Sequence, residues 1–204
     1  MPDQSSSARL DPGQLLASMD RALAQRPPGD VWVFGYGSLI WRPGFEPAGR
    51  RMARVRGYHR SLCLWSRINR GSPDDPGLVF GLDRGGNCRG VILQVPEDAL
   101  RPVFHDLWQR EMLMDSYLPR WLTCSTPDGD IKALAFVINR QASGYTGELQ
   151  EQHLLDIVRR ARGRYGPCMD YVMDTAQALR DCGIRDRRLE HIVQQLQHDP
   201  HAAL

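Results

Sequence analysis

The sequence predicts an α+β fold in which a mixed β-sheet closes into a small barrel flanked by helices. Three observations lead to this prediction. Short apolar runs of strand length recur between residues 31 and 139. One helical pattern interrupts them near residue 100, and three further helical patterns end the chain. Neither an internal repeat nor a low-complexity linker divides the middle of the 204 residues, so we expect a single domain over residues 30–197.

The two ends of the chain are expected to lie outside that domain. Residues 1–12 are polar and rich in serine, which predicts a disordered tail, and they lack the apolar segment of a secretory signal. Residues 13–29 predict a helical extension that ends at Arg26-Pro27-Pro28-Gly29, and residues 198–204 predict a second tail. The apolar residues on one side of the expected helix over 13–25 are Leu15, Leu16, Met19 and Leu23.

The first strand runs into a loop lined with glycine. Residues 31–34 are apolar and β-prone, which predicts a buried strand. Gly35 and Gly37 follow at once, and Pro43 ends any regular structure soon afterwards. Backbone amides in such a loop can point inward together and hold an anion, beside the hydroxyl of Ser38. The alternative is an ordinary turn, because the pattern lacks the third glycine of a dinucleotide site and the Gly-Lys-Ser/Thr of a P-loop.

The next segment, residues 50–66, is basic first and then apolar. Its arginines alternate with small apolar residues, which favours a half-buried strand with a solvated face over a nucleic-acid or anion patch. Beyond Gly57 the apolar phase moves to Tyr58, Leu62 and Leu64, which indicates a bulge. The arginines of the segment are Arg50, Arg51, Arg54, Arg56 and Arg60.

A loop and a hairpin are expected next. Residues 69–77 form a loop by composition, and Arg70 either reaches an anionic ligand or is a surface charge. Residues 78–82 and 90–95 predict two strands that are joined by a turn over residues 83–87.

The central helix carries the most informative single residue. It begins near Pro96-Glu97-Asp98, and its apolar stripe is Leu100, Val103, Phe104, Leu107 and Trp108. The next position of that stripe is Glu111. A carboxylate on an apolar face must pair, take up a proton or line a cavity. Glu111 is therefore either an arginine-paired or surface glutamate, or a general base or acid whose pKa is raised by burial.

The rest of the chain completes the barrel and adds helices. Residues 117–125 and 131–139 predict two strands around the turn at residues 127–130. Residues 149–162, 169–182 and 186–197 predict helices.

Composition excludes several classes of protein. A net charge of +2 gives no reason to expect nucleic acid or an acidic membrane as partner, and no apolar run approaches membrane-spanning length. The five widely spaced cysteines include no Cys-x-x-Cys, so they indicate neither a zinc ribbon nor a thioredoxin-like site, but buried or idle thiols in a reducing cytosol.

Several motifs taken together resemble the ChaC branch of the γ-glutamylcyclotransferases. The most specific are the Tyr-Gly-Ser-Leu loop and the Arg-Glu-Met segment, and the resemblance covers about residues 31–195. The motifs lie at residues 33–43, 56–58, 70–72, 76–77, 86–91, 110–112, 117, 166–167 and 171.

The resemblance implies a small mixed β-barrel with flanking helices, acting in the cytoplasm without metal or cofactor. It implies cleavage of glutathione to 5-oxoproline and cysteinylglycine, with Glu111 as the catalytic proton acceptor. It also implies a set of residues that bind the substrate, namely Gly35, Tyr36, Gly37, Ser38, Leu39, Ile40, Arg70, Tyr117 and Tyr171. The sequence does not decide whether the glycine loop holds the substrate carboxylate or the oxyanion that develops on the carbonyl.

Other functions remain as alternatives. A cyclotransferase for other γ-glutamyl amino acids or amines more typically resembles Tyr-Gly-Ser-Asn, whereas this chain has Leu39. A non-catalytic module that binds γ-glutamyl groups would not need Glu111. Nucleic-acid binding through Arg50–Arg60 is opposed by the small net charge, and no cysteine lies in a nucleophile motif.

Overall fold

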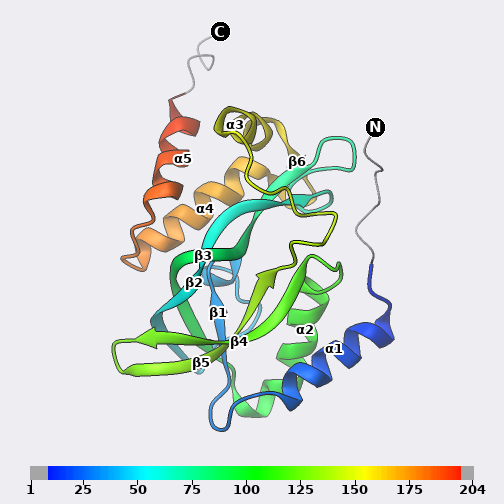
Figure 1. Ribbon diagram of the computed structural model, residues 1–204, viewed down its shortest axis with the longest axis vertical. Coiled ribbons are helices and arrows are strands. Elements are labelled where there is room, and N and C mark those ends of the chain that lie inside the picture. The colour runs from blue at the N-terminus through cyan, green and yellow to red at the C-terminus, as the bar shows by residue number, and fades with distance from the viewer. Residues whose placement is uncertain (1–8, 199–204) are drawn as a thin grey trace. The chain divides into compact units, whose positions relative to one another are not determined.

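The computed structural model describes residues 9–198 and contains a closed five-stranded barrel (Figure 1). The barrel order is β1-β3-β2-β4-β5, and β3 also pairs with β5. β1 runs antiparallel to β3 and parallel to β5, so the sheet is mixed. The strand bounds are β1 Trp32–Gly35, β2 Gly49–Ser66, β3 Gly77–Gln94, β4 Tyr117–Thr126 and β5 Gly129–Ile138. This architecture confirms the predicted fold class.

The contacts divide the chain into two compact units. The first contains the described residues up to 61 together with residues 81–145, and the second contains residues 62–80 and the described residues from 146 onward. The single domain expected over residues 30–197 stays a prediction. The tail expected over residues 198–204 falls outside the described residues except for His198.

In the first unit, two helices pack together beside the strands of the barrel (Figure 1). α1 (Pro12–Ala24) begins at Asp11, whose carboxylate accepts a hydrogen bond from the Gln14 amide in a capping box. α2 (Leu100–Glu111) follows the short 3₁₀ turn η2 (Glu97–Ala99). The Trp108 ring stacks on Phe104 and meets Phe136 of β5 edge-on, each with 5.5 Å between ring centroids. The predicted apolar stripe of α2 therefore faces the core.

The N-terminal segment is partly different from the expectation. Of the tail predicted over residues 1–12, the structure describes residues 9–12. There the Leu10 amide donates to the Leu113 carbonyl at 3.0 Å. In α1, Leu15 and Met19 are buried as predicted, but Leu16 is 44% exposed and Ala22 takes its place in the core. The buried positions 15, 19 and 22 follow the helical period more closely than position 16 does.

The hairpin expected at residues 78–95 is wrong, because β3 is one continuous strand of 18 residues. The segment predicted as its turn contains Gly85 at φ 104° and Gly86 at φ 68°. These left-handed glycines change the local course of the strand without ending it, which is the behaviour of a glycine bend in a long strand. In β2, Gly57 has φ 81° at the position where the sequence predicts a bulge.

The second unit contains the three helices predicted at the end of the chain. They are α3 (Glu151–Arg160), α4 (Cys168–Asp181) and α5 (Arg187–Gln197), and they pack against one another. A short hairpin of β6 (Arg162–Gly163) and β7 (Gly166–Pro167) connects α3 to α4. Leu155, Val158, Val172 and Val193 lie in the core of this unit.

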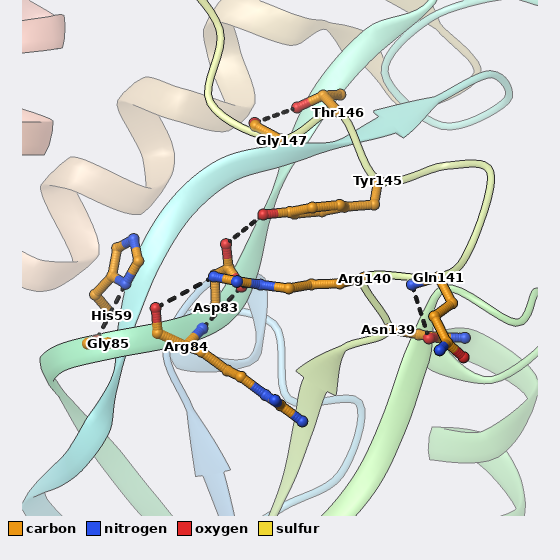
Figure 2. A network of polar contacts seen from close by, with 10 residues as sticks. All are labelled: His59, Asp83, Arg84, Gly85, Asn139, Arg140, Gln141, Tyr145, Thr146 and Gly147. Atoms are coloured by element: carbon orange, nitrogen blue, oxygen red, sulfur yellow. Dashed lines mark hydrogen bonds and ion pairs between the residues drawn. The ribbon is translucent and has the colours of Figure 1, made fainter.

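A buried carboxylate joins β3 to the segment that follows β5 (Figure 2). Asp83 accepts a hydrogen bond from Arg140 Nε at 2.6 Å and one from the Tyr145 hydroxyl at 2.9 Å. Its own neighbour, the Arg84 amide, donates a third at 2.8 Å. Burial alone would raise the pKa of Asp83, but these hydrogen bonds outweigh burial and hold it below its ordinary value.

Replacing Asp83 with asparagine is expected to lower the free energy of unfolding at pH 7 by about 1–3 kcal/mol, because three hydrogen bonds lose their charged, buried acceptor. The folded-state pKa of Asp83 lies below the unfolded value. Its contribution is therefore present at neutral pH and is lost as the pH falls through the depressed pKa. Urea unfolding of D83N and of the exposed control D74N, between pH 7 and pH 3, measures this. An equal effect of D83N at both ends of the range would contradict it.

Candidate functional site

The glycine-lined loop is built where β1 ends. From Gly35 to Ile40 every residue is buried except Ser38, which is half-buried. The chain turns through a single 3₁₀ turn, η1 (Ser38–Ile40), in which the Ile40 amide donates to the Gly37 carbonyl at 2.9 Å and the Arg42 amide to the Ser38 carbonyl at 2.7 Å. The amides of Ser38 and Leu39 make no hydrogen bond to another residue in the described part of the chain. They are the backbone donors that this loop can offer to an anion.

Close backbone packing holds this loop against β3. Gly35 pairs with Val91, and its carbonyl oxygen lies where a side chain on Gly90 would have to fit. A Cβ atom on Gly90 would stand 2.3 Å from that oxygen and 2.9 Å from Phe34 Cζ. The start of the loop therefore depends on the absence of a side chain at Gly90.

The side chain of Tyr36 is buried and reaches β5. Its hydroxyl donates to the Phe136 carbonyl of β5 at 2.8 Å, and its ring lies 6.3 Å from that of Phe34. Only 6% of the residue is exposed. These contacts fix the backbone of Tyr36 at the beginning of the loop.

Arg60 corrects one expectation from the sequence. It was predicted on a solvated strand face, but it is 6% exposed. Its Nε donates to the Tyr36 carbonyl and its Nη2 donates to the Arg89 carbonyl at 2.6 Å. The phase change after Gly57 explains the difference, because residue 60 shares the inward phase of Leu62 and Leu64. The predicted bulge contained the signal for this buried arginine.

Glu111 is the last residue of α2, and the neighbouring Arg110 contacts both its carboxylate and Ser38 of the loop. The Glu111 side chain is 16% exposed, and Oε1 lies 3.0 Å from Nε of Arg110. The same guanidinium donates from Nη2 to Ser38 Oγ at 2.8 Å and from Nη1 to the Arg42 carbonyl at 2.5 Å. Burial raises the pKa of Glu111 above its ordinary value, and the charge of Arg110 opposes part of that rise.

Two buried polar atoms near these segments have no hydrogen-bond partner among the described residues. One is Nε1 of Trp41, directly after η1, and the other is Oδ1 of Asp115, four residues after Glu111. A free indole N–H suits a carboxylate, and a free carboxylate oxygen suits an ammonium group. Their sequence positions alone gave no signal that they would be unpaired.

The other predicted site residues fall in two places. Tyr117 is buried in the first unit, where it begins β4 opposite Ile138. Arg70 and Tyr171 lie together in the second unit, with the Arg70 guanidinium 5.4 Å from the centre of the Tyr171 ring. Arg70 Nη1 also donates to the carbonyls of Tyr165 at 2.8 Å and Pro167 at 3.1 Å. Arg70 is 7% exposed, so it is a buried residue of this unit and not a surface charge.

Four of the five cysteines are buried, namely Cys63, Cys88, Cys124 and Cys168, and Cys182 is half-buried. Burial raises the pKa of Cys124 to about 12 and also raises that of Cys168, so neither is ionised near neutral pH. Within residues 9–198, no three His, Cys, Asp or Glu side chains are grouped so that they could hold a metal ion. No helix in that range has both the length and the apolar character needed to cross a membrane.

The burial of Glu111 has a consequence for stability. Its pKa in the folded protein lies above the ordinary 4.5, so the folded state binds the proton more tightly than the unfolded state does. The contribution of Glu111 to the free energy of unfolding is most favourable below pH 4.5 and is lost as the pH rises through the raised pKa. Glutamine cannot ionise, so we expect the stability of Glu111→Gln, measured relative to the unmodified protein, to increase as the pH is raised from 4 to 8. Thermal unfolding across that range measures the difference, and a constant difference would contradict the expectation.

Comparison with known proteins shows which family the chain resembles over most of its length. The model of the family described as ChaC-like protein matches residues 31–199. The glutathione-specific γ-glutamylcyclotransferase of Escherichia coli (strain K12) is 33% identical over 182 residues, which are 88% of this chain and 79% of that protein. The mouse glutathione-specific γ-glutamylcyclotransferase 1 is 33% identical over 203 residues, covering 95% and 91%. A crystal structure of a yeast γ-glutamylcyclotransferase specific to glutathione has a TM-score of 0.77 at 18% identity, covering 84% of this chain and 99% of that one, and so shares the fold.

Proposed function

The chain belongs to the ChaC-like protein family, and we propose that it is a γ-glutamylcyclotransferase that cleaves glutathione to 5-oxoproline and cysteinylglycine. The relatives named for this activity share about a third of their residues with it over most of both chains. The observation in the structure that supports the proposal most directly is the contact of Arg110 with both Glu111 and Ser38. It links a buried carboxylate to a loop that can bind an anion.

The reaction is an internal aminolysis of the γ-glutamyl amide. The α-ammonium group of the substrate gives a proton to the Glu111 carboxylate, and the free amine attacks the γ-carbonyl carbon. A new C–N bond closes the five-membered ring, and the bond to the cysteinyl nitrogen breaks as that nitrogen receives the proton from Glu111. The second proton lost by the attacking nitrogen appears on the released amine, which leaves as ammonium. Water is not consumed, and no net proton is released.

The surroundings of Glu111 suit this role. A carboxylate with a raised pKa is a better proton acceptor than an exposed one, and it can return the proton to the leaving group. One residue can thus serve both proton transfers, so the reaction needs no separate acid. The amides of the loop can steady either the substrate carboxylate or the oxyanion of the tetrahedral intermediate. Folding the substrate so that the amine meets the carbonyl contributes a further entropic gain.

The substrate-binding assignments are part of the same proposal. Gly35–Ile40 and Tyr117 would contact the γ-glutamyl group. Arg70 and Tyr171 are proposed to bind substrate as well, and the Arg70 guanidinium already donates to two carbonyls. The cytoplasmic location and the lack of nucleic-acid partners remain predictions from the sequence.

Incubation of the purified protein with glutathione tests the function. Equimolar 5-oxoproline and cysteinylglycine are the expected products, and mass spectrometry detects both. Parallel incubation with γ-glutamylalanine separates the glutathione enzyme from a cyclotransferase of broader specificity. If the protein binds glutathione but releases neither product, it is a binding module and the proposed activity is wrong.

A further inference from the structure

We propose that Arg110 is a positioning residue that holds the Glu111 carboxylate against the Gly35–Ile40 loop. This inference rests on the proposed function for its catalytic consequence. The contacts that carry it are all made within the first unit.

The guanidinium of Arg110 makes three directed contacts with two segments. Nε faces Glu111 Oε1 at 3.0 Å, Nη2 donates to Ser38 Oγ at 2.8 Å, and Nη1 donates to the Arg42 carbonyl at 2.5 Å. The planar fork of an arginine fixes its nitrogen atoms relative to one another. Because Nη2 is bonded to the loop, the position of Nε is also set, and Nε in turn sets the position of the Glu111 carboxylate. A lysine has a single nitrogen and cannot hold all three partners in this way.

The ion pair of Arg110 with Glu111 is partly withdrawn from water. The Arg110 side chain is 29% exposed and that of Glu111 is 16% exposed, so water screens the pair less than it does a surface ion pair. The loop is supported on a second side by Arg60, which donates to the Tyr36 carbonyl. Arg50 supports the loop as well, because its Nη1 donates to the Ile40 carbonyl at 3.1 Å. Of these three arginines, Arg110 forms an ion pair with Glu111.

Arg110 is the charge that acts most directly on the carboxylate. Burial raises the pKa of Glu111, and the positive charge of Arg110 lowers it again in part. Other charged groups lie on the same helix and on neighbouring elements. They include Arg101 and Asp106 of α2, Asp20 and Arg21 of α1, Glu97 and Asp98 of η2, Arg42 after η1, Asp115 of the following turn, Arg120 of β4, and Asp130 and Lys132 of β5. Asp20 pairs with Arg101, which lies nine residues before Arg110 and so about 14 Å along the helix.

The test compares Arg110→Gln with Arg110→Lys, Ser38→Ala and the matched control Arg101→Gln. Arg101 is on the same helix, carries the same charge and makes an ion pair, but it contacts neither the loop nor Glu111. We expect R110Q to lower kcat for glutathione by roughly tenfold or more, with a smaller change in KM, because the base is misplaced. R110K should recover part of the rate, S38A should lose less than R110Q, and R101Q should match the unmodified protein.

The pH profile separates positioning from a loss of fold. Without the positive charge the proton affinity of Glu111 rises, so the acid limb of kcat/KM should move to higher pH in R110Q and less so in R110K. A profile unchanged in R110Q, or a rate equal to that of R101Q, would overturn the inference.

A second readout does not need turnover. Carbon-13 NMR of labelled glutamate carboxyls follows the titration of Glu111, identified by its loss in Glu111→Gln. The midpoint should move to higher pH in R110Q, or in R110K if R110Q does not fold. An unmoved midpoint overturns the inference. A moved midpoint in a protein that fails to cleave glutathione supports the Arg110–Glu111 coupling and counts against the proposed function instead.

Discussion

Replacing Glu111 with glutamine is expected to lower glutathione turnover by at least about 100-fold, because general acid–base catalysis of this kind contributes 10²–10⁴ in rate. Glutamine keeps nearly the same shape but cannot accept the ammonium proton. The fold should survive, since the change removes a buried charge whose ionisation is unfavourable in the folded state. Product release measured with saturating glutathione gives the effect on kcat.

The matched control is Glu97→Gln, an exposed glutamate in the turn before the same helix. It removes the same charge from the chain and should leave turnover within a factor of about two, since surface changes away from a site have small effects. Near-normal formation of 5-oxoproline by E111Q would refute the assignment of Glu111 as the proton acceptor. Circular dichroism of both variants shows whether the fold is kept.

Gly90→Ala is expected to lower the free energy of unfolding by about 1–3 kcal/mol, because a methyl group must be forced into packed backbone. The new Cβ would stand 2.3 Å from the Gly35 carbonyl oxygen and 2.9 Å from a buried ring carbon of Phe34. Neither neighbour is the end of a flexible side chain, so β1 must move away from β3. Because Gly35 begins the binding loop, kcat/KM should fall by about 100-fold in the fraction that remains folded.

Gly49→Ala provides the comparison. Its Cβ would meet Gln94 Oε1 at 2.7 Å, which is the movable end of a side chain, so the neighbour can rotate aside. We expect a change of no more than about 0.5 kcal/mol for G49A in urea unfolding. Equal stability of G90A and G49A would contradict the expectation, because it would mean that a methyl group fits between Gly90 and the Gly35 carbonyl oxygen.

The parts of the fold that the sequence predicted are those with a strong local signal. The stripe of α2 and the closing helices repeat at 3.6 residues, and the strands at residues 117–139 are strand-forming runs on either side of a turn at residues 127–130. The structure confirms these elements. The hairpin at residues 78–95 failed because Gly85 and Gly86 carry a turn signal that a long strand can also use. Local composition does not say whether the neighbouring strand of a barrel continues past such glycines.

The candidate site shows the same division. Glu111 stood out because it interrupts an apolar stripe, which is a local signal. Arg60 and Arg110 were noted only as members of a basic segment and of the Arg-Glu-Met motif, because an arginine gives no sign in sequence of which carbonyl or hydroxyl it will reach. Their partners lie 24 and 72 residues away, at Tyr36 and Ser38. From the sequence, Glu111 was either paired with an arginine or a buried residue with a raised pKa. In the structure it has both features, because it pairs with Arg110 and burial raises its pKa.

The pairing of β1 determines when the protein can acquire its loop during synthesis. Val33 of β1 pairs with Leu93 of β3 and with Leu134 of β5, a partner about 100 residues further along the chain. A nascent chain that has not yet released β5 from the ribosome can form α1 but cannot close the ring of strands. Such distant pairings slow folding, since the ends must meet before any contact stabilises them. Truncations that end before residue 134 should thus lack a formed loop even though they contain every residue from Gly35 to Glu111.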